Sequence, residues 1–162
     1  MSHDLNPLAR RFVQDAGHMT QSIGMGRVVG QIYAYLYFSS EPRGLADMQR
    51  VLGISKGSAS TGVRQLEQWG AVRKIWVHGD RKDYYEANDW FGRIAKNALF
   101  DTLGKKLTAY SAMLDEIESE LTTLEDGNGQ RDFLKKRIQH LRKFQTRVHG
   151  VLDSPVLKML LK

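Results

Sequence analysis

The chain has 162 residues, of which 41% are apolar and 26% are charged, and its formal net charge is +6 at pH 7. This length and composition fit a single globular domain, or one small domain with an added oligomerisation element. The chain has no cysteine, which excludes disulfides, thiol catalysis and metal sites with cysteine ligands. The positive charge favours an anionic partner, although charge alone does not separate nucleic acid from a membrane surface or from simple solubility.

Signals for targeting and catalysis are missing from the sequence. The first residues, MSHDLNPLARRF, lack the apolar centre of a signal peptide, and no apolar run approaches the roughly 18 residues that a membrane span needs. The five histidines show neither i,i+4 pairing nor the neighbouring glutamate of a metal site, and there is no glycine-rich phosphate-binding pattern. We therefore expect a cytoplasmic protein that is not an enzyme, needs no cofactor and has no membrane partner.

The first predicted helix runs from Leu5 to Gly17. Asn6 is its predicted N-cap, and Pro7 occupies the first helical position, where the missing N–H has no cost. The apolar side chains predicted to form one stripe along this helix are Leu8, Phe12, Val13 and Met19.

A helix-turn-helix is predicted in the next part of the chain. A strongly apolar helix follows Gly26, ends at residues 39–42 and should form the centre of the globule. A short helix from Gly44 to Leu52 comes next, and Gly53 separates it from a helix that begins after Ser55, its predicted N-cap. Two helices joined by a short turn with glycine are the helix-turn-helix signature.

The helix after Ser55 has two different faces. Ala59, Val63 and Leu66 fall four and three residues apart, as a face that packs on a core requires. The opposite face has small, hydroxylated, amide or cationic side chains and can approach a polyanion closely. Its members are Lys56, Gly57, Ser58, Ser60, Thr61, Arg64 and Gln68.

Two glycines in this helix, Gly57 and Gly62, each cost about 1 kcal/mol of helix stability relative to alanine. We attribute one of them to close approach of the backbone to phosphate. The other is interpreted as a packing position against the preceding helix.

A β-hairpin is predicted after Gly70, which ends the helix. Its first strand contains Val72, Ile75 and Val77, its turn is residues 78–82, and its returning strand is residues 83–87. Residues 73–82 contain four basic residues and one aspartate, a local charge of +3. A basic hairpin beside a polar-faced helix is the layout of a winged helix-turn-helix, in which the helix enters the major groove and the wing reaches phosphates or the neighbouring minor groove.

Aromatic residues gather in two places. Trp69 and Trp76 are interpreted as hydrophobic anchors of the wing, with a stacking platform as the alternative. The second set is interpreted as core because of its helical spacing, with an aromatic box for a quaternary ammonium ion as the alternative. Its members are Tyr33, Tyr35, Tyr37, Phe38, Trp90 and Phe91.

A hairpin of long helices is predicted after Asp89. The first helix has a heptad seam formed by Leu107, Tyr110, Leu114, Ile117, Leu121 and Leu124. Residues 126–129, DGNG, end it, and a second helix runs from Gln130 to about Leu152. The apolar residues of this second helix are Leu134, Ile138, Leu141, Phe144, Val148 and Val151. A last short helix within residues 151–161, broken by Pro155, has an apolar side that we expect a partner subunit to cover.

The two arms of this helical hairpin have opposite charge. Residues 115–126 contain six acidic and no basic residues, whereas residues 131–147 contain seven basic residues and one acid. We expect the arms to attract each other, either within a chain or across a dimer. The alternatives are that both are simply solvated faces, or that the basic arm is a second DNA-contacting surface.

Residues 26–90 resemble the glycine-betaine regulator (GbsR) branch of the MarR superfamily of multiple-antibiotic-resistance regulators. The resemblance rests on GISKGS at residues 53–58 and GDRKDYYEA at residues 79–87. It implies a bacterial transcriptional regulator that binds a pseudo-palindromic operator as a winged-helix homodimer and acts as a repressor modulated by a small ligand. It also implies that residues 55–68 are the recognition helix and that Arg81 is the wing residue. No motif for the ligand is found.

We therefore predict a mainly α protein with a small β-hairpin, a winged helix-turn-helix with a long-helix dimerisation region. Residues 1–25 are assigned to the dimer interface, residues 26–88 to binding of double-stranded DNA, and residues 89–162 to helical dimerisation. The alternative function is a protein-interaction adaptor that docks partners on the C-terminal helical hairpin and has lost DNA binding. The absence of acids from the seven-residue polar face favours the regulator.

The predicted DNA contacts divide by chemistry. Lys56, Lys74 and Lys82 are assigned to phosphates, which position the duplex. Arg64 is the first candidate for a guanine. The remaining candidates for base edges are Ser58, Ser60, Thr61 and Gln68, and the predicted DNA-binding set also includes Ser55, Gly57 and Arg81.

Overall fold

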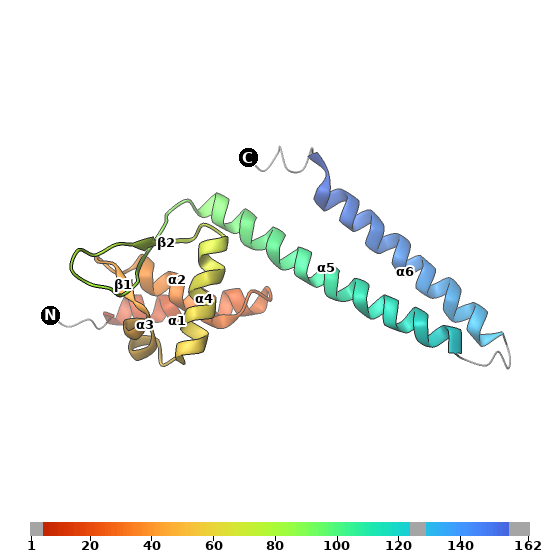
Figure 1. The fold of residues 1–162 in the computed structure, drawn as a ribbon, viewed down its shortest axis with the longest axis horizontal. Coiled ribbons are helices and arrows are strands. Elements are labelled where there is room, and N and C mark those ends of the chain that lie inside the picture. Colours follow the sequence, from red (N-terminus) through yellow and green to blue (C-terminus); the bar gives the residue numbers. More distant parts are fainter. Residues whose placement is uncertain (1–4, 124–128, 156–162) are drawn as a thin grey trace. The chain divides into compact units, whose positions relative to one another are not determined.

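The structure is a computed structural model that describes residues 5–123 and 129–155 (Figure 1). The chain divides into two compact units, with the division between Ala98 and Leu99. The elements are α1 (Pro7–Ser22), α2 (Arg27–Tyr37), β1 (Arg43–Gly44), α3 (Leu45–Leu52), α4 (Lys56–Gln68), β2 (Val72–Ile75), β3 (Tyr84–Ala87), α5 (Phe91–Thr123) and α6 (Gln130–Asp153). This architecture confirms the predicted fold class, mainly α with a small antiparallel sheet in a winged helix-turn-helix. No helix among the described residues is both long and apolar enough to cross a membrane.

Helix α1 begins as predicted and ends later than predicted. The side chain of Asn6 accepts a hydrogen bond from the Ala9 amide at 2.8 Å, which confirms the N-cap. The helix does not end at Gly17 but continues to Ser22. Gly17 is a packing position, because a Cβ there would lie 2.7 Å from Cγ of Gln31 on α2. Gly17 is therefore explained by the close approach of α2 and does not mark the end of the helix.

Helix α2 is the centre of the first unit, as predicted. Ile32 and Tyr35 are almost completely buried, and Met48 of α3 and Val63 of α4 pack in the same cluster. Helix α4 approaches α2 closely at Gly62, where a Cβ would lie 2.7 Å from Cδ1 of Ile32. Gly62 is thus a packing glycine, although its neighbour is α2 and not the preceding helix α3.

The sheet has three strands in the order β1-β3-β2, all antiparallel. Strand β2 pairs with β3 from Val72 opposite Ala87 to Ile75 opposite Tyr84. Strand β1 pairs with the other edge of β3 and has only two residues, so no sequence pattern predicted it. The predicted extension of the first strand to Val77 is wrong, because β2 ends at Ile75 and the loop begins there.

The aromatic set in and around α2 divides into core and surface. Tyr35 is 1% exposed and belongs to the core. Tyr37, Phe38 and Phe91 are each more than 40% exposed, yet their rings contact one another, with centroids 5.4 Å apart for Tyr37 and Phe91 and 5.5 Å apart for Tyr37 and Phe38. Trp90 is also exposed. The core interpretation is therefore wrong for these four residues.

In the second unit, the described parts of α5 and α6 pack through an apolar seam. Leu114 and Leu121 of α5 and Ile138 of α6 are buried, with Ile117 and Leu134 packed against them. These residues confirm the central part of the predicted seam, while Leu124 lies outside the described residues. The predicted last short helix also lies outside them from residue 156 onward, and α6 ends at Asp153.

Part of the predicted seam on α6 faces solvent. Leu141, Phe144 and Val151 are exposed, whereas Gln145 is 9% exposed and occupies the buried face instead. The assignment of these three residues to the seam within the hairpin is wrong. They form a second apolar stripe on the helix, because residues spaced by three and seven positions share a face that differs from that of Ile138.

The acidic arm on α5 and the basic arm on α6 form ion pairs within the chain through Arg142. Arg142 of α6 donates to Asp115 at 2.5 Å and to Glu118 at 2.8 Å on α5. The hydrogen bonds to Glu118 and then Asp115 raise the pKa of the Arg142 guanidinium above its ordinary value. The intramolecular alternative therefore holds for Arg142.

Candidate nucleic-acid interface

The start of α4 is capped by the first predicted site residue. Oγ of Ser55 accepts a hydrogen bond from the Ser58 amide at 3.1 Å, so the predicted N-cap is confirmed. The hydroxyl of Ser55 also donates to Oγ of Ser58 at 2.9 Å. Lys56 and Gly57 are exposed in the first helical turn, where the free amide groups and the helix dipole favour an anion.

The two faces of α4 are separated as the sequence predicts. Ala59, Val63 and Leu66 are buried. The predicted DNA-facing residues lie together on the other side, where Lys56, Gly57, Thr61, Arg64 and Gln68 are exposed and Ser58 and Ser60 are half-buried. Lys56 and Arg64 have no ion-pair partner among the described residues, so their positive charges are open to an anionic ligand.

The remaining members of α4 fit this arrangement. At Gly57 the nearest atom to a Cβ would be Oγ of Ser55 at 3.9 Å, an ordinary contact distance, so close packing within the chain does not explain this glycine. The helix has one acidic residue, Glu67, in its last turn, and the charge of Glu67 acts on Lys74 of β2. The first three turns of α4 therefore present no negative side chain.

Asp80 fixes the conformation of the wing, the segment from residue 76 to residue 83 between β2 and β3. Its carboxylate accepts hydrogen bonds from the Lys82 amide at 3.0 Å and from the Tyr84 hydroxyl at 2.8 Å. Both hydrogen bonds lower the pKa of the Asp80 carboxyl below its ordinary value, and the bond from the Lys82 amide has the larger effect. Gly79 before it has a φ of +84°, a value that favours glycine. Residues 79–81, GDR, thus contain a turn-forming residue, Asp80, that is not in the predicted DNA-binding set.

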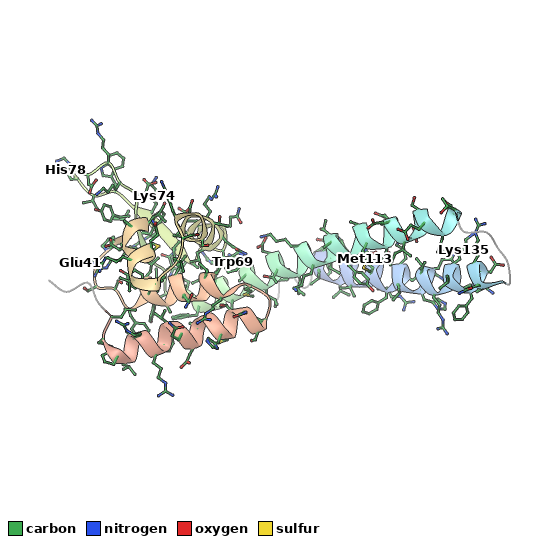
Figure 2. All side chains as sticks on the ribbon, turned by 90° about the horizontal axis from the view of Figure 1, so that it is seen from below. Glu41, Trp69, Lys74, His78, Met113 and Lys135 are labelled. Atoms are coloured by element: carbon green, nitrogen blue, oxygen red, sulfur yellow. The ribbon has the colours of Figure 1, made fainter. Side chains whose placement is uncertain are left out.

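The cations of the hairpin that form no ion pair among the described residues lie in the wing. At the base of the hairpin Arg73 pairs with Glu86, and Lys74 pairs with Asp83 at 2.7 Å, which raises the Lys74 pKa. Arg81 and Lys82 are exposed and have no ion pair in the part of the chain that the structure describes. Figure 2 shows the hairpin with Lys74 near the helices and His78 at the projecting tip. If Lys74 contacts a phosphate, its ammonium group must bind that phosphate and Asp83 at the same time.

One groove lies between α4 and the wing. It has a volume of about 730 Å³ and is lined by residues 41–44, which include Glu41 and Arg43, by the start of α3, by Lys56 of α4 and by Lys82, Asp83 and Tyr84 of the hairpin. Asp47, on the α3 side, already accepts from the Gly44 amide at 3.3 Å. Two of the three lysines assigned to phosphates, Lys56 and Lys82, therefore face a common hollow surface although they are far apart in the sequence.

The two tryptophans of this region have opposite environments. Trp69 is 3% exposed, and its main-chain carbonyl accepts a hydrogen bond from the side chain of Asn97 at 2.9 Å. It is an anchor, as predicted. Trp76 is 84% exposed, so the interpretation of Trp76 as an anchor is wrong.

Comparisons with known proteins identify relatives of one functional kind. No protein-family model matches the chain. The chain is 24% identical to the HTH-type transcriptional regulator MmpR5 of Mycobacterium tuberculosis, over 91% of this chain and 84% of that protein. It is 29% identical to the HTH-type transcriptional repressor GbsR of Bacillus subtilis, over 70% of this chain and 63% of the repressor. It is 24% identical to the putative HTH-type regulator YvaV of the same organism, over 71% of this chain and 65% of YvaV. The match thus spans less than two thirds of the length of either Bacillus relative.

A solved structure supports the fold. The crystal structure of a transcriptional regulator matches 96% of this chain and 100% of its own, with a TM-score of 0.58 and 22% sequence identity. At this identity the likeness shows that the two chains share a fold. The relatives and this structure all have names of transcriptional regulators and none has the name of an enzyme.

Proposed function

We propose that the chain is a DNA-binding transcriptional regulator of the MarR superfamily that binds a pseudo-palindromic operator as a homodimer. The observation that supports DNA binding best is the polar face of α4 beside a wing whose two exposed cations, Arg81 and Lys82, form no ion pair among the described residues. The names of the relatives, all HTH-type regulators, point to the same activity.

The proposed contacts follow from the positions of the side chains. Helix α4 enters the major groove, with Arg64 toward a guanine edge. Lys56 and Lys82 line the groove between α4 and the wing and bind the phosphate backbone. In a homodimer the two copies of α4 stand about 34 Å apart, one turn of B-DNA, and read two half-sites.

The homodimer part of the proposal is supported by exposed apolar side chains outside the wing and α4. On α1, Leu8, Phe12 and Met19 are 76%, 53% and 63% exposed. On α6, Phe144 and Val151 are 65% and 60% exposed. Contiguous apolar side chains on a soluble protein are typical of an interface. We assign residues 1–25 and 89–162 to dimerisation and residues 26–88 to DNA binding.

Repression modulated by a small ligand completes the proposal. GbsR and OpcR of Bacillus subtilis are both named repressors, which supports repression over activation. Release from the operator would require two dimer geometries with different spacing between the α4 helices, with the ligand favouring one of them.

The decisive experiment is selection of bound duplexes from a random-sequence pool at about physiological salt, followed by sequencing. We expect an inverted repeat whose centres are about 10 base pairs apart. The matched variant is Arg64→Ala, which should lose the preference at one position of each half-site, with Lys143→Ala on α6 as a control that keeps it. If no duplex is enriched, the regulator proposal is wrong. The interaction-adaptor alternative, with the α5–α6 hairpin as its docking platform, would then replace it.

A further inference from the structure

Trp76 is more exposed than any other large apolar side chain that the structure describes. Its neighbours along the hairpin do not cover it, and the buried Trp69 shows that the same region of the chain has room for an indole in its core. We propose that Trp76 is a DNA contact that enters the minor groove next to each operator half-site. This inference rests on the proposed function and adds a residue outside the predicted DNA-binding set.

The backbone holds Trp76 in a defined position. It follows Ile75 directly, and Ile75 pairs with Tyr84 in the last register position of the β2–β3 ladder. On the other side of the wing, Asp80 accepts hydrogen bonds from the Lys82 amide and the Tyr84 hydroxyl, and the Asp80 amide donates to the Val77 carbonyl at 3.2 Å. The main chain that positions the indole is therefore braced, and little backbone freedom is lost when the indole binds.

The charges around Trp76 identify the kind of partner. Trp76 lines a hollow of about 240 Å³ together with Asp80, Arg81 and Lys82. The Asp80 carboxylate is bound by the Lys82 amide and the Tyr84 hydroxyl, and neither cation forms an ion pair within the described residues, so these three side chains leave an excess of one positive charge. Lys74 and Asp83, which also line it, neutralise each other. An apolar protein partner would desolvate these charges and leave the excess cation without a counter-ion. A polyanion with apolar surfaces between its charges satisfies both the indole and the cations, and DNA is such a partner.

The minor groove fits this pair of properties better than the major groove. Wings reach the minor groove beside the major groove that the helix occupies, and proteins insert apolar side chains there between base steps or against sugars. Such contacts read the width and deformability of the duplex and not the pattern of hydrogen-bonding groups. Trp76 should therefore set a sequence preference outside the half-site that α4 reads.

The test compares Trp76→Ala, Trp76→Phe and the matched control Trp90→Ala, which removes another exposed tryptophan, one that precedes α5 and lies outside the wing. Binding to the enriched duplex is measured across a salt series. Trp76→Ala should weaken binding by roughly 10-fold, from the loss of aromatic contacts with the duplex. Trp76→Phe should recover part of this loss, and Trp90→Ala should bind like the unmodified chain.

The salt series separates the indole contact from a general distortion of the wing. Because the indole is uncharged, Trp76→Ala should leave the slope of log K against log[salt] unchanged, whereas Lys82→Ala should reduce it by about 1 per phosphate contact. A distorted wing would move Arg81 and Lys82 as well and flatten the slope in Trp76→Ala. Repeating the selection with Trp76→Ala should erase preferences only at positions flanking each half-site.

The possible failures point to different conclusions. If the unmodified chain enriches no duplex, the proposed function is wrong and the role of Trp76 falls with it. If the unmodified chain binds and Trp76→Ala binds equally well with the same flanking preferences, only the role of Trp76 is overturned. A flattened salt slope in Trp76→Ala would also overturn it, because the residue would then be structural.

Discussion

The phenol hydroxyl of Tyr33 on α2 donates a hydrogen bond to the main-chain carbonyl of Asn88, the residue after β3, at 2.7 Å. Asn88 also donates its side-chain amide to the Gly70 carbonyl at 2.9 Å and its main-chain amide to the Ala71 carbonyl at 2.8 Å. The central helix, the end of the hairpin and the turn after α4 are therefore joined at one asparagine. This junction fixes how the hairpin leaves α4.

The Tyr33 hydroxyl should make stability depend on pH above 10. Burial, followed by the charges of Tyr37 and Asp89, raises the pKa of Tyr33 to about 12 from an ordinary value of 10.0. The folded state therefore keeps the proton that the unfolded state loses. Its contribution to the unfolding free energy is fully present below pH 10 and is lost as the pH rises toward 12.

The measurement for Tyr33 is denaturant unfolding between pH 8 and pH 12, compared with Tyr33→Phe. At pH 8 the variant should be less stable by about 1 kcal/mol, because the Asn88 carbonyl loses a donor. Between pH 10 and pH 12 the difference between the two proteins should shrink. A constant difference over this range would contradict the prediction.

Alanine substitutions at the two helix glycines of α4 should have opposite effects on stability. At Gly62 the new Cβ would lie 2.7 Å from Cδ1 of Ile32, and the overpacking should cost about 1–3 kcal/mol. At Gly57 no neighbour is closer than 3.9 Å, so the gain in helix propensity should stabilise the protein by up to about 1 kcal/mol. Urea unfolding of both variants checks this. A destabilised Gly57→Ala would indicate a packing contact at that position.

The local signals of helix α4 are sufficient to predict the helix itself. Ser55 is an N-cap followed by apolar residues at helical spacing, and both features act within a few residues of each other. The structure therefore agrees with the sequence on the start of α4, its buried face and its end before Gly70. The same holds for Asn6 at the start of α1.

Features that depend on distant partners were not predicted. The sequence around Gly17 suggests a helix end, because its packing role depends on Gln31 of α2, a residue that is distant in the sequence. Strand β1 forms because the edge of β3 opposite β2 is free to pair with it. Its two residues are too few to show the alternation of a strand in the sequence. Tryptophan is a residue type that is common in strands, but whether Trp76 is buried depends on which other parts of the chain cover it. On α6, spacing alone did not separate the buried face of Ile138 from the exposed stripe of Phe144.

Removing single cations from the candidate interface should separate specificity from electrostatics. Arg64→Ala should weaken binding to the enriched duplex by roughly 10-fold to 100-fold and relax the preference at one base pair. Lys56→Ala should weaken binding to all duplexes alike and reduce the salt slope by about 1 per phosphate contact. Fluorescence anisotropy with the enriched and a scrambled duplex measures both effects. If the two variants behave the same, the assignment of bases to Arg64 and phosphates to Lys56 is wrong.

The ion pairs of Arg142 should stabilise the helical hairpin in a salt-dependent way. Its side chain is 28% exposed and its guanidinium binds both Asp115 and Glu118, so Arg142→Met should leave two acids unpaired and lower the melting temperature at low salt. The difference should diminish near 1 M salt because exposed charges are screened. Lys143→Met is the matched control, since Lys143 has no ion pair within the described part of α6. Equal melting temperatures at low salt would show that the Arg142 pairs contribute nothing.

A charge on the exposed stripe of α6 should disrupt the proposed homodimer without unfolding the chain. Phe144 is 65% exposed, so Phe144→Glu should change the stability of the helix itself by little, but it would place an unpaired carboxylate in an apolar interface. Light scattering at a series of concentrations should show a dimer for the unmodified chain and a monomer for the variant. Gln139→Glu adds the same charge to the same helix outside that stripe and should remain dimeric. A variant that still dimerises would exclude this stripe from the interface, and because one half-site alone binds weakly, a monomeric Phe144→Glu should also lose the operator.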